Sequence, residues 1–138
     1  MNDYEKILCP CGNILEDVYD HNPVKGSIIR SQDDDFFTRY LGEKFSELLE
    51  MIKLDNREQW IKKYLPNNIN GKQISNEQIF SLFIGLRTNN CELRIFECPG
   101  CGRLLIETNN GSNSFVPFSP DTTGYKHLLT SQTYLTLS

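Results

Sequence analysis

Two pairs of cysteines near opposite ends of the chain constrain its fold more than any other sequence feature. The first pair lies in Cys9-Pro10-Cys11-Gly12 and the second in Cys98-Pro99-Gly100-Cys101-Gly102. A Cys-x-x-Cys-Gly segment is the usual knuckle that presents two thiolates to one metal ion, and four thiolates make a closed tetrahedral zinc site. The glycine after each pair lets the chain turn with φ > 0, so that backbone N–H groups point at the sulfurs. We therefore expect one structural Zn²⁺ ion, bound by Cys9, Cys11, Cys98 and Cys101.

The long separation of the two pairs predicts a split zinc ribbon. Residues 12–97 lie between them, whereas the pairs of a compact ribbon are about 15–20 residues apart. Loop-closure entropy grows only logarithmically with loop length, so this separation does not argue against one shared site. We expect the two halves of the ribbon in segments 4–31 and 91–118, and a helical insertion over 32–87.

The composition predicts one cytoplasmic globular domain over residues 1–138. The chain is 38% hydrophobic and 23% charged, which is ordinary globular usage. Its longest apolar runs, such as Leu82-Phe83-Ile84, are far too short to span a membrane, and the N-terminus lacks the basic and apolar regions of a signal peptide. Thiols stay reduced in the cytoplasm, so a metal explains the five cysteines better than disulfides do.

Short β-prone segments flank both knuckles and predict antiparallel strands. A turn signal at Asn109-Asn110-Gly111 predicts that the last of these strands returns alongside its predecessor. The tail 125–138 is expected to dock in an extended conformation through its apolar residues. The strands are predicted over residues 4–8, 13–19, 24–30, 91–97, 103–108 and 114–118.

The middle of the chain predicts helices. Ser31 is expected to cap a helix whose first turn carries Asp33-Asp34-Asp35, and apolar residues then recur at three- and four-residue spacing as far as Ile52. A second helix is expected over 56–64, and a third over Asn76–Arg87 behind a capping box formed by Ser75 and Gln78. The predicted fold class is α+β: an antiparallel sheet built from both termini around a split zinc ribbon, with an inserted layer of two or three helices packed against it.

Two other functions for the cysteines are less consistent with the sequence. Cys98-Pro99-Gly100-Cys101 resembles a redox dithiol, but such motifs place the first cysteine at a helix N-terminus, and Gly102–Ile106 has the composition of a strand. A redox dithiol would also leave Cys9 and Cys11 unexplained. A catalytic zinc needs an open coordination position, which four thiolates do not leave.

The remaining polar residues give no catalytic pattern, so we expect a protein that is not an enzyme. Cys91 is expected to be a small buried hydrophobic residue of a strand rather than a fifth ligand. His21 and His127 do not belong to any arrangement that suggests a catalytic triad, and no Walker loop, dinucleotide fingerprint or pair of catalytic carboxylates is present. Trp60 is expected in the core, with an interface anchor as the alternative.

The acidic charge argues against nucleic acid as the partner. The formal net charge of −4 becomes about −6 when four deprotonated thiolates bind Zn²⁺, and such a chain repels phosphate backbones on average. Asp33-Asp34-Asp35 is expected to be a solvated helix start, with a contact for a cation or a basic partner as the alternative. A zinc-ribbon module for nucleic acid or transcription is a second functional hypothesis, and it would need a basic face from Lys25, Arg30, Arg39 and Lys62-Lys63.

Several segments resemble a group of small, uncharacterised bacterial zinc-ribbon-like proteins. The most specific is the second knuckle with its continuation, Cys98–Glu107. Proteins of this kind are often suspected to be immunity proteins of polymorphic toxin systems. The resemblance implies a cytoplasmic, non-catalytic immunity or adaptor protein whose partner is another protein, such as a cognate toxin, and it implies the four cysteines as ligands. The other similar segments are Cys9–Ile14, Asn22–Gly26, Ser31–Asp33 and Phe115–Phe118.

Overall fold

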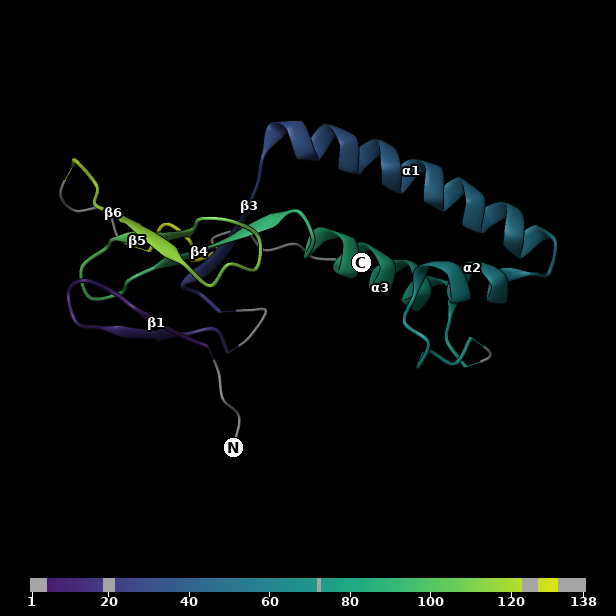
Figure 1. Ribbon diagram of the computed structural model, residues 1–138, viewed down its shortest axis with the longest axis horizontal. Coiled ribbons are helices and arrows are strands. Elements are labelled where there is room, and N and C mark those ends of the chain that lie inside the picture. The colour runs from purple at the N-terminus through teal and green to yellow at the C-terminus, as the bar shows by residue number, and fades with distance from the viewer. Residues whose placement is uncertain (1–4, 19–21, 72, 123–126, 132–138) are drawn as a thin grey trace. The chain divides into compact units, whose positions relative to one another are not determined.

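The computed structural model divides the chain into two compact units (Figure 1). We call residues 1–28 and 92–138 the sheet unit and residues 29–91 the helical unit. The structure describes residues 5–18, 22–71, 73–122 and 127–131. Over these residues it has six strands in antiparallel sheets and three helices, which confirms the α+β class.

The first knuckle is the turn of a hairpin between β1 (Lys6–Leu8) and β2 (Ile14–Glu16). Ile7 and Leu15 lie opposite each other and are buried, whereas the next pair, Leu8 and Ile14, is 71% and 61% exposed. This alternation is the two-residue period of a strand with one buried face. The hairpin forms a two-stranded sheet of its own, so the described residues form two antiparallel sheets where the sequence predicted one.

The other four strands form one sheet in the order β3-β4-β5-β6. The N–H of Glu97, at the end of β4, donates to the carbonyl of Val24 at 2.8 Å and so lies beside the start of β3. The sheet therefore combines one strand from before the helices with three strands from after them. The strands are β3 (Lys25–Ile29), β4 (Glu92–Glu97), β5 (Leu104–Glu107) and β6 (Phe115–Phe118).

Pro117 lies on the edge strand β6, opposite Leu105 of β5. The N–H of Thr108 donates to the carbonyl of Ser114 at 2.8 Å. Because hydrogen-bonded and non-hydrogen-bonded pairs alternate along an antiparallel ladder, the Pro117 nitrogen faces the open edge of the sheet. Proline is tolerated at this position because no ladder hydrogen bond is lost.

A small apolar core joins the hairpin to the four-stranded sheet within the sheet unit. The two inward side chains of the hairpin pack in one cluster with Phe96 of β4 and Leu105 of β5, and Phe96 meets Phe115 edge to face with ring centroids 5.6 Å apart. Two of the four knuckle cysteines belong to this cluster, so the sulfurs lie at the border of the core. The buried members are Ile7, Cys9, Leu15, Phe96, Cys98 and Leu105.

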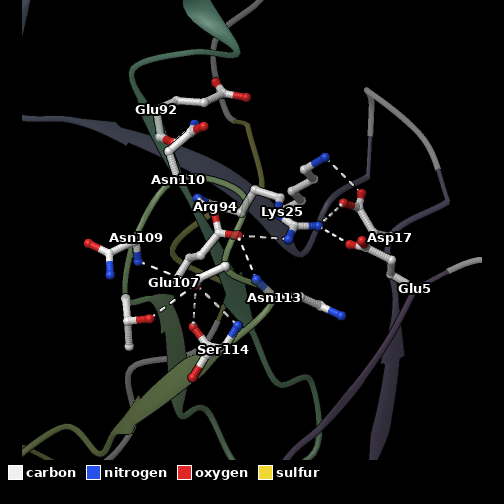
Figure 2. Close-up of polar contacts among 12 residues, drawn as sticks. Glu5, Asp17, Lys25, Glu92, Arg94, Glu107, Asn109, Asn110, Asn113 and Ser114 are labelled. Carbon is white, nitrogen blue, oxygen red and sulfur yellow. Dashed lines mark hydrogen bonds and ion pairs between the residues drawn. The ribbon is translucent and has the colours of Figure 1, made fainter.

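Arg94 of β4 makes a second connection between the hairpin and the sheet (Figure 2). Its guanidinium binds Glu107 of β5 at 2.8 Å, Asp17 beyond β2 at 3.0 Å, and Glu5 before β1. Glu107 is only 2% exposed. Burial raises the pKa of Glu107, but hydrogen bonds from Arg94 more than offset this and hold the pKa below its usual value. Lys25 of β3 also pairs with Asp17, at 2.7 Å.

The helical unit has its own core around Trp60, which is 1% exposed as predicted. Its helices are α1 (Ser31–Lys53), α2 (Arg57–Tyr64) and α3 (Asn76–Thr88). Trp60 of α2 packs against Phe83 of α3 with ring centroids 5.0 Å apart. The buried members of this core are Leu48, Trp60, Ile61, Leu65, Ile79 and Phe83.

The predicted N-terminal cap is confirmed for α3 but not for α1. The capping box of α3 is confirmed, because the Ser75 hydroxyl accepts from the Gln78 N–H at 3.1 Å and the Gln78 amide oxygen accepts from the Ser75 N–H at 2.9 Å. The prediction of Ser31 as the cap of α1 was wrong. Arg30 takes that position without a side-chain cap, and Ser31 is the first helical residue. The carboxylates of Asp33 and Asp34 still fall in the first turn.

The described part of the tail, residues 127–131, forms a turn rather than the predicted extended segment. The N–H of Thr130 bonds back to the carbonyl of His127, whose φ is +62°. The turn docks on the sheet unit, since the N–H of Leu129 donates to Glu97 at 3.1 Å and the Thr130 hydroxyl donates to the carbonyl of Pro23 at 3.2 Å. The rest of the tail prediction lies outside the described residues. None of the helices described combines the length and apolar character needed to cross a bilayer.

Replacing Arg94 with methionine should destabilise the sheet unit by about 3–5 kcal/mol, because it leaves the buried Glu107 carboxylate without a cation. Arg94→Met combined with Glu107→Met should recover most of this loss, since no buried charge then remains. The free energy of opening, measured by hydrogen exchange of the β4 and β5 amides, gives the comparison.

Arg39→Met is the matched control for this experiment. Arg39 pairs with Asp35 at 3.1 Å, but both side chains are largely exposed, so its loss should cost less than about 1 kcal/mol. Equal effects of Arg94→Met and Arg39→Met would contradict the assignment of Arg94 as a buried connection.

Candidate metal centre

The fold brings the four knuckle cysteines together in the sheet unit. All four sulfur atoms lie within 4.8 Å of one another. The Sγ atoms of Cys9 and Cys101 are 3.5 Å apart, and those of Cys11 and Cys98 are 3.6 Å apart. A tetrahedral site with metal–sulfur bonds of about 2.3 Å has sulfur–sulfur edges of about 3.8 Å. The cluster therefore already has nearly the size that one tetrahedral ion requires.

Each knuckle closes with a backbone hydrogen bond from its glycine to its first cysteine. The N–H of Gly12 donates to the carbonyl of Cys9, and the N–H of Gly102 donates to the carbonyl of Cys98, each at 2.9 Å. The φ angles of the two glycines are +100° and +78°. These left-handed conformations explain the glycine after each pair, as the sequence predicted. The one-residue difference between Cys-Pro-Cys and Cys-Pro-Gly-Cys makes the second turn one residue longer than the first, and both turns end at the glycine.

A second backbone bond closes each knuckle across the strands that flank it. The N–H of Cys9 donates to the carbonyl of Asn13, and the N–H of Cys98 donates to the carbonyl of Arg103, both at 2.9 Å. Asn13 and Arg103 are thus equivalent residues, each directly after the knuckle glycine. The first cysteine of each pair is held by these bonds and is also buried at 1% exposure.

The surroundings of Cys98 favour its thiolate form. Burial raises the pKa of Cys98, but the N–H groups of Cys101 and Gly100 and the side-chain amide of Asn13 hydrogen-bond to the sulfur and lower the pKa to about 6. The Asn13 bond spans 3.5 Å from Nδ2 to Sγ and comes from the opposite half of the site. Backbone N–H groups do point at this sulfur, as the sequence predicted.

The other buried sulfur, of Cys9, is held in its neutral form. Burial raises its pKa to about 12, and the N–H of Cys11 offsets this only in part. Burial also raises the pKa of Cys101, but the backbone and guanidinium of Arg103 donate to its sulfur and bring the pKa below its usual value. The pKa of Cys9 is therefore raised, whereas the pKa values of Cys98 and Cys101 are lowered.

Two residues beside the sulfurs, Asn13 and Arg103, were missed in the sequence analysis. Each donates to a knuckle sulfur, Asn13 to Cys98 and Arg103 to Cys101. The signal in the sequence was their position, since each polar side chain directly follows the glycine of a knuckle. That position alone does not say which sulfur the side chain reaches.

Among the residues that the structure describes, the sulfur cluster includes none of the other candidates. Cys91 precedes β4 rather than belonging to it and is only half-buried, and its thiol donates to the carbonyl of Thr88 at 3.4 Å. The prediction of Cys91 as a buried strand residue was therefore wrong. His127 is exposed in the tail turn and does not belong to the sulfur cluster. His21 lies outside the described residues.

The local structure after Cys98 does not provide what a redox dithiol needs. Gly102 turns the chain into strand β5, so that no helix begins at this pair. Four cysteine sulfurs are the donor set that zinc or iron takes in S4 sites. Such a set fills all four positions, so the arrangement suits an ion that holds chain segments together rather than one that activates a substrate.

Comparison with known proteins identifies the family of the chain. The sequence model of a family described as a domain of unknown function, DUF8617, matches residues 5–122. No curated protein and no solved structure matches the chain. The matched range includes both knuckles, all three helices and all six strands described above. The chain therefore belongs to the DUF8617 family.

Proposed function

We propose that this chain is a non-catalytic binding protein with one structural zinc ion, held by Cys9, Cys11, Cys98 and Cys101 as the two halves of a split zinc ribbon. The observation that carries the proposal is the convergence of four sulfurs within 4.8 Å from two knuckles, each of which closes at a glycine of positive φ. Zinc bound by four thiolates has no open position for substrate or water, so its role is structural. The ion connects the N-terminal hairpin to the strands that follow the helices.

We further propose that its partner is a protein, as for a cytoplasmic bacterial immunity or adaptor protein. The resemblance of the knuckle segments to suspected immunity proteins supports this partner class. The helical unit also carries an exposed aromatic side chain, Phe36 of α1, which is 67% exposed and stacks on Tyr40 with ring centroids 6.2 Å apart. Exposed aromatic residues are common anchors of protein interfaces. Asp34 and Asp35 precede Phe36 and are exposed as well.

The distribution of charge favours a protein partner over nucleic acid. The sheet unit contains five lysines and arginines against nine aspartates and glutamates, whereas the helical unit contains nine of each. The whole net charge of −4 thus belongs to the unit with the knuckles, and zinc bound to four thiolates would make it about −6. A ribbon that binds phosphate backbones needs the opposite sign.

The basic residues that would form a nucleic-acid face are mostly paired with carboxylates. Lys25 binds Asp17 at 2.7 Å and Arg39 binds Asp35 at 3.1 Å. The other two pairs, Arg30 with Asp33 and Lys63 with Glu47, are both at 3.6 Å. These pairs offset the positive charge that the alternative function would need.

The purified protein should contain one zinc ion per chain. Cys98→Ser should lose most of the metal, because it removes one of four ligands, whereas Cys91→Ser should keep it. Elemental analysis under reducing conditions measures the zinc and distinguishes it from iron. Chelation should lower the free energy of unfolding of the sheet unit by several kcal/mol, since structural zinc contributes directly to folding. A wild-type protein without metal, or a Cys98→Ser variant with full zinc, would refute the proposed site.

The zinc-loaded protein should show no measurable binding to random DNA or RNA at physiological ionic strength. A protein that neutralises several phosphates binds tightly at low salt and loses affinity steeply as salt rises, and the charge of this chain has the wrong sign for such contacts. Gel shifts over a series of salt concentrations give the measurement. Tight binding that weakens steeply with salt would establish the nucleic-acid function instead.

If Asp34 and Asp35 face a basic partner, Asp34→Asn combined with Asp35→Asn should slow association with that partner and reduce the salt dependence of the association rate. Carboxylates that face a basic partner speed its encounter, and their loss at a helix start should cost at most about 1 kcal/mol of stability. The binding kinetics use the protein that a pull-down with the wild-type chain from its native host identifies.

The matched control for this pair is Glu50→Gln combined with Asp55→Asn. It removes two exposed carboxylates at the opposite end of α1 and just beyond it. The control should leave the association rate unchanged. If both double variants associate like the wild type, Asp33-Asp34-Asp35 is only a helix start and the partner surface lies elsewhere.

A further inference from the structure

One side chain reaches from the first half of the sulfur cluster into the second. The carbonyl of Asn13 accepts from the N–H of Cys9 at 2.9 Å, within its own knuckle. Its side-chain amide donates to the Sγ of Cys98, in the other knuckle, at 3.5 Å. Asn13 is therefore hydrogen-bonded to the first cysteine of both pairs at once.

The amide of Asn13 occupies the space in which residue 100 would carry a side chain. A Cβ atom built on Gly100 would lie 2.2 Å from Nδ2 of Asn13 and 3.3 Å from its Cγ. The φ of Gly100 is outside the left-handed region, unlike the φ of Gly12 and Gly102. Conformation alone thus does not require a glycine at position 100. A side chain there would instead have to displace the Asn13 amide.

We infer that Asn13 is a positioning residue of the metal site, whose amide packs over Gly100 and locks the two knuckles into one tetrahedral set of sulfurs. The inference rests on the proposed function as a metal-binding protein. In this arrangement the N–H···S bond fixes the direction of the Cys98 sulfur, and the contact with Gly100 fixes the distance between the knuckles. Asn13 is not itself a ligand.

The chemistry of a four-thiolate site gives the Asn13 amide a clear role. Four thiolates around a divalent ion carry a net charge of −2, and N–H donors from the surrounding protein disperse it over the sulfurs. Arg103, the equivalent residue of the second knuckle, donates to Cys101 of its own knuckle. Loss of a residue that orients a ligand typically weakens metal binding by about 10–100-fold.

The test is a titration of the reduced, metal-free full chain with Co²⁺, whose thiolate complexes absorb visible light. The readouts are the dissociation constant, the position of the Co²⁺ absorption bands and the rate of metal release to a chelator. The variants are Asn13→Ala, Asn13→Asp, Gly100→Ala and the double variant Asn13→Ala with Gly100→Ala. Gly42→Ala is the matched glycine control, since a Cβ there meets no atom within 4 Å.

Asn13→Ala and Gly100→Ala should each weaken Co²⁺ binding by about 10–100-fold, shift its absorption bands and speed its release. The double variant should bind no more weakly than Asn13→Ala, because a methyl group at position 100 then has room. Asn13→Asp keeps the size of the side chain but removes the donor and adds a negative charge beside Cys98, so it should bind more weakly than Asn13→Ala. Gly42→Ala should match the wild type.

The outcomes separate this inference from the proposed function. If Asn13→Ala keeps the metal affinity and absorption of the wild type, the inference is overturned and the proposed zinc site is not affected. The same holds if Gly100→Ala weakens binding equally in the wild type and in Asn13→Ala. A wild-type chain that binds neither Co²⁺ nor Zn²⁺ would overturn both. Trp60 fluorescence reports whether the helical unit of each variant is folded. If Gly100→Ala alone fails to fold, its rescue by Asn13→Ala still tests the contact.

Discussion

The sheet unit depends on holding together two chain segments that lie on either side of a long helical insertion. Four sulfurs meet within 4.8 Å at the border of its core, and four thiolates in so small a volume repel each other unless protons or a cation neutralise them. The apolar contacts available to oppose that repulsion are few, with Ile7 and Leu15 as the only hairpin strand residues buried in this core. A hairpin of two three-residue strands is marginal by itself in water, so the interactions at its two ends determine whether it stays in place.

Those two ends are stabilised by different chemistry. At the knuckle end the sulfurs and the Asn13 amide connect the halves. At the other end Arg94 joins the carboxylates of Glu5 and Asp17 to the buried Glu107. The apolar cluster lies among these contacts and is too small to replace either of them. The helical unit has no such requirement, because Trp60 and Phe83 give it a core made entirely from residues of one continuous segment.

How much of this could be predicted from the sequence depends on whether an interaction is local. The capping box at Ser75 and the turns at Gly12 and Gly102 involve residues within a few positions of each other, and they were predicted correctly. The convergence of the four cysteines was predictable although residues 12–97 separate the two pairs, because two cysteine knuckles in one chain have few functions other than binding one metal ion. The separate hairpin sheet and the contact of Asn13 with Cys98 were not predictable, since strand pairing and side-chain direction across distant segments depend on the whole fold. Ser31 was wrongly predicted as the cap of α1. The helix begins one residue earlier relative to that prediction, because Arg30, which directly follows β3, is the last residue with an extended backbone.

The proline of strand β6 limits how another protein can recognise the sheet. Phe115 and Pro117 are the two residues of β6 whose backbone groups face the open edge, and Pro117 has no N–H to offer there. An added strand could therefore find only one donor along this four-residue edge. Recognition by strand addition, which derives its affinity from main-chain hydrogen bonds, is disfavoured at β6. A protein that binds on this side has to recognise side chains, and the exposed Phe118 and Val116 are the apolar ones that β6 presents.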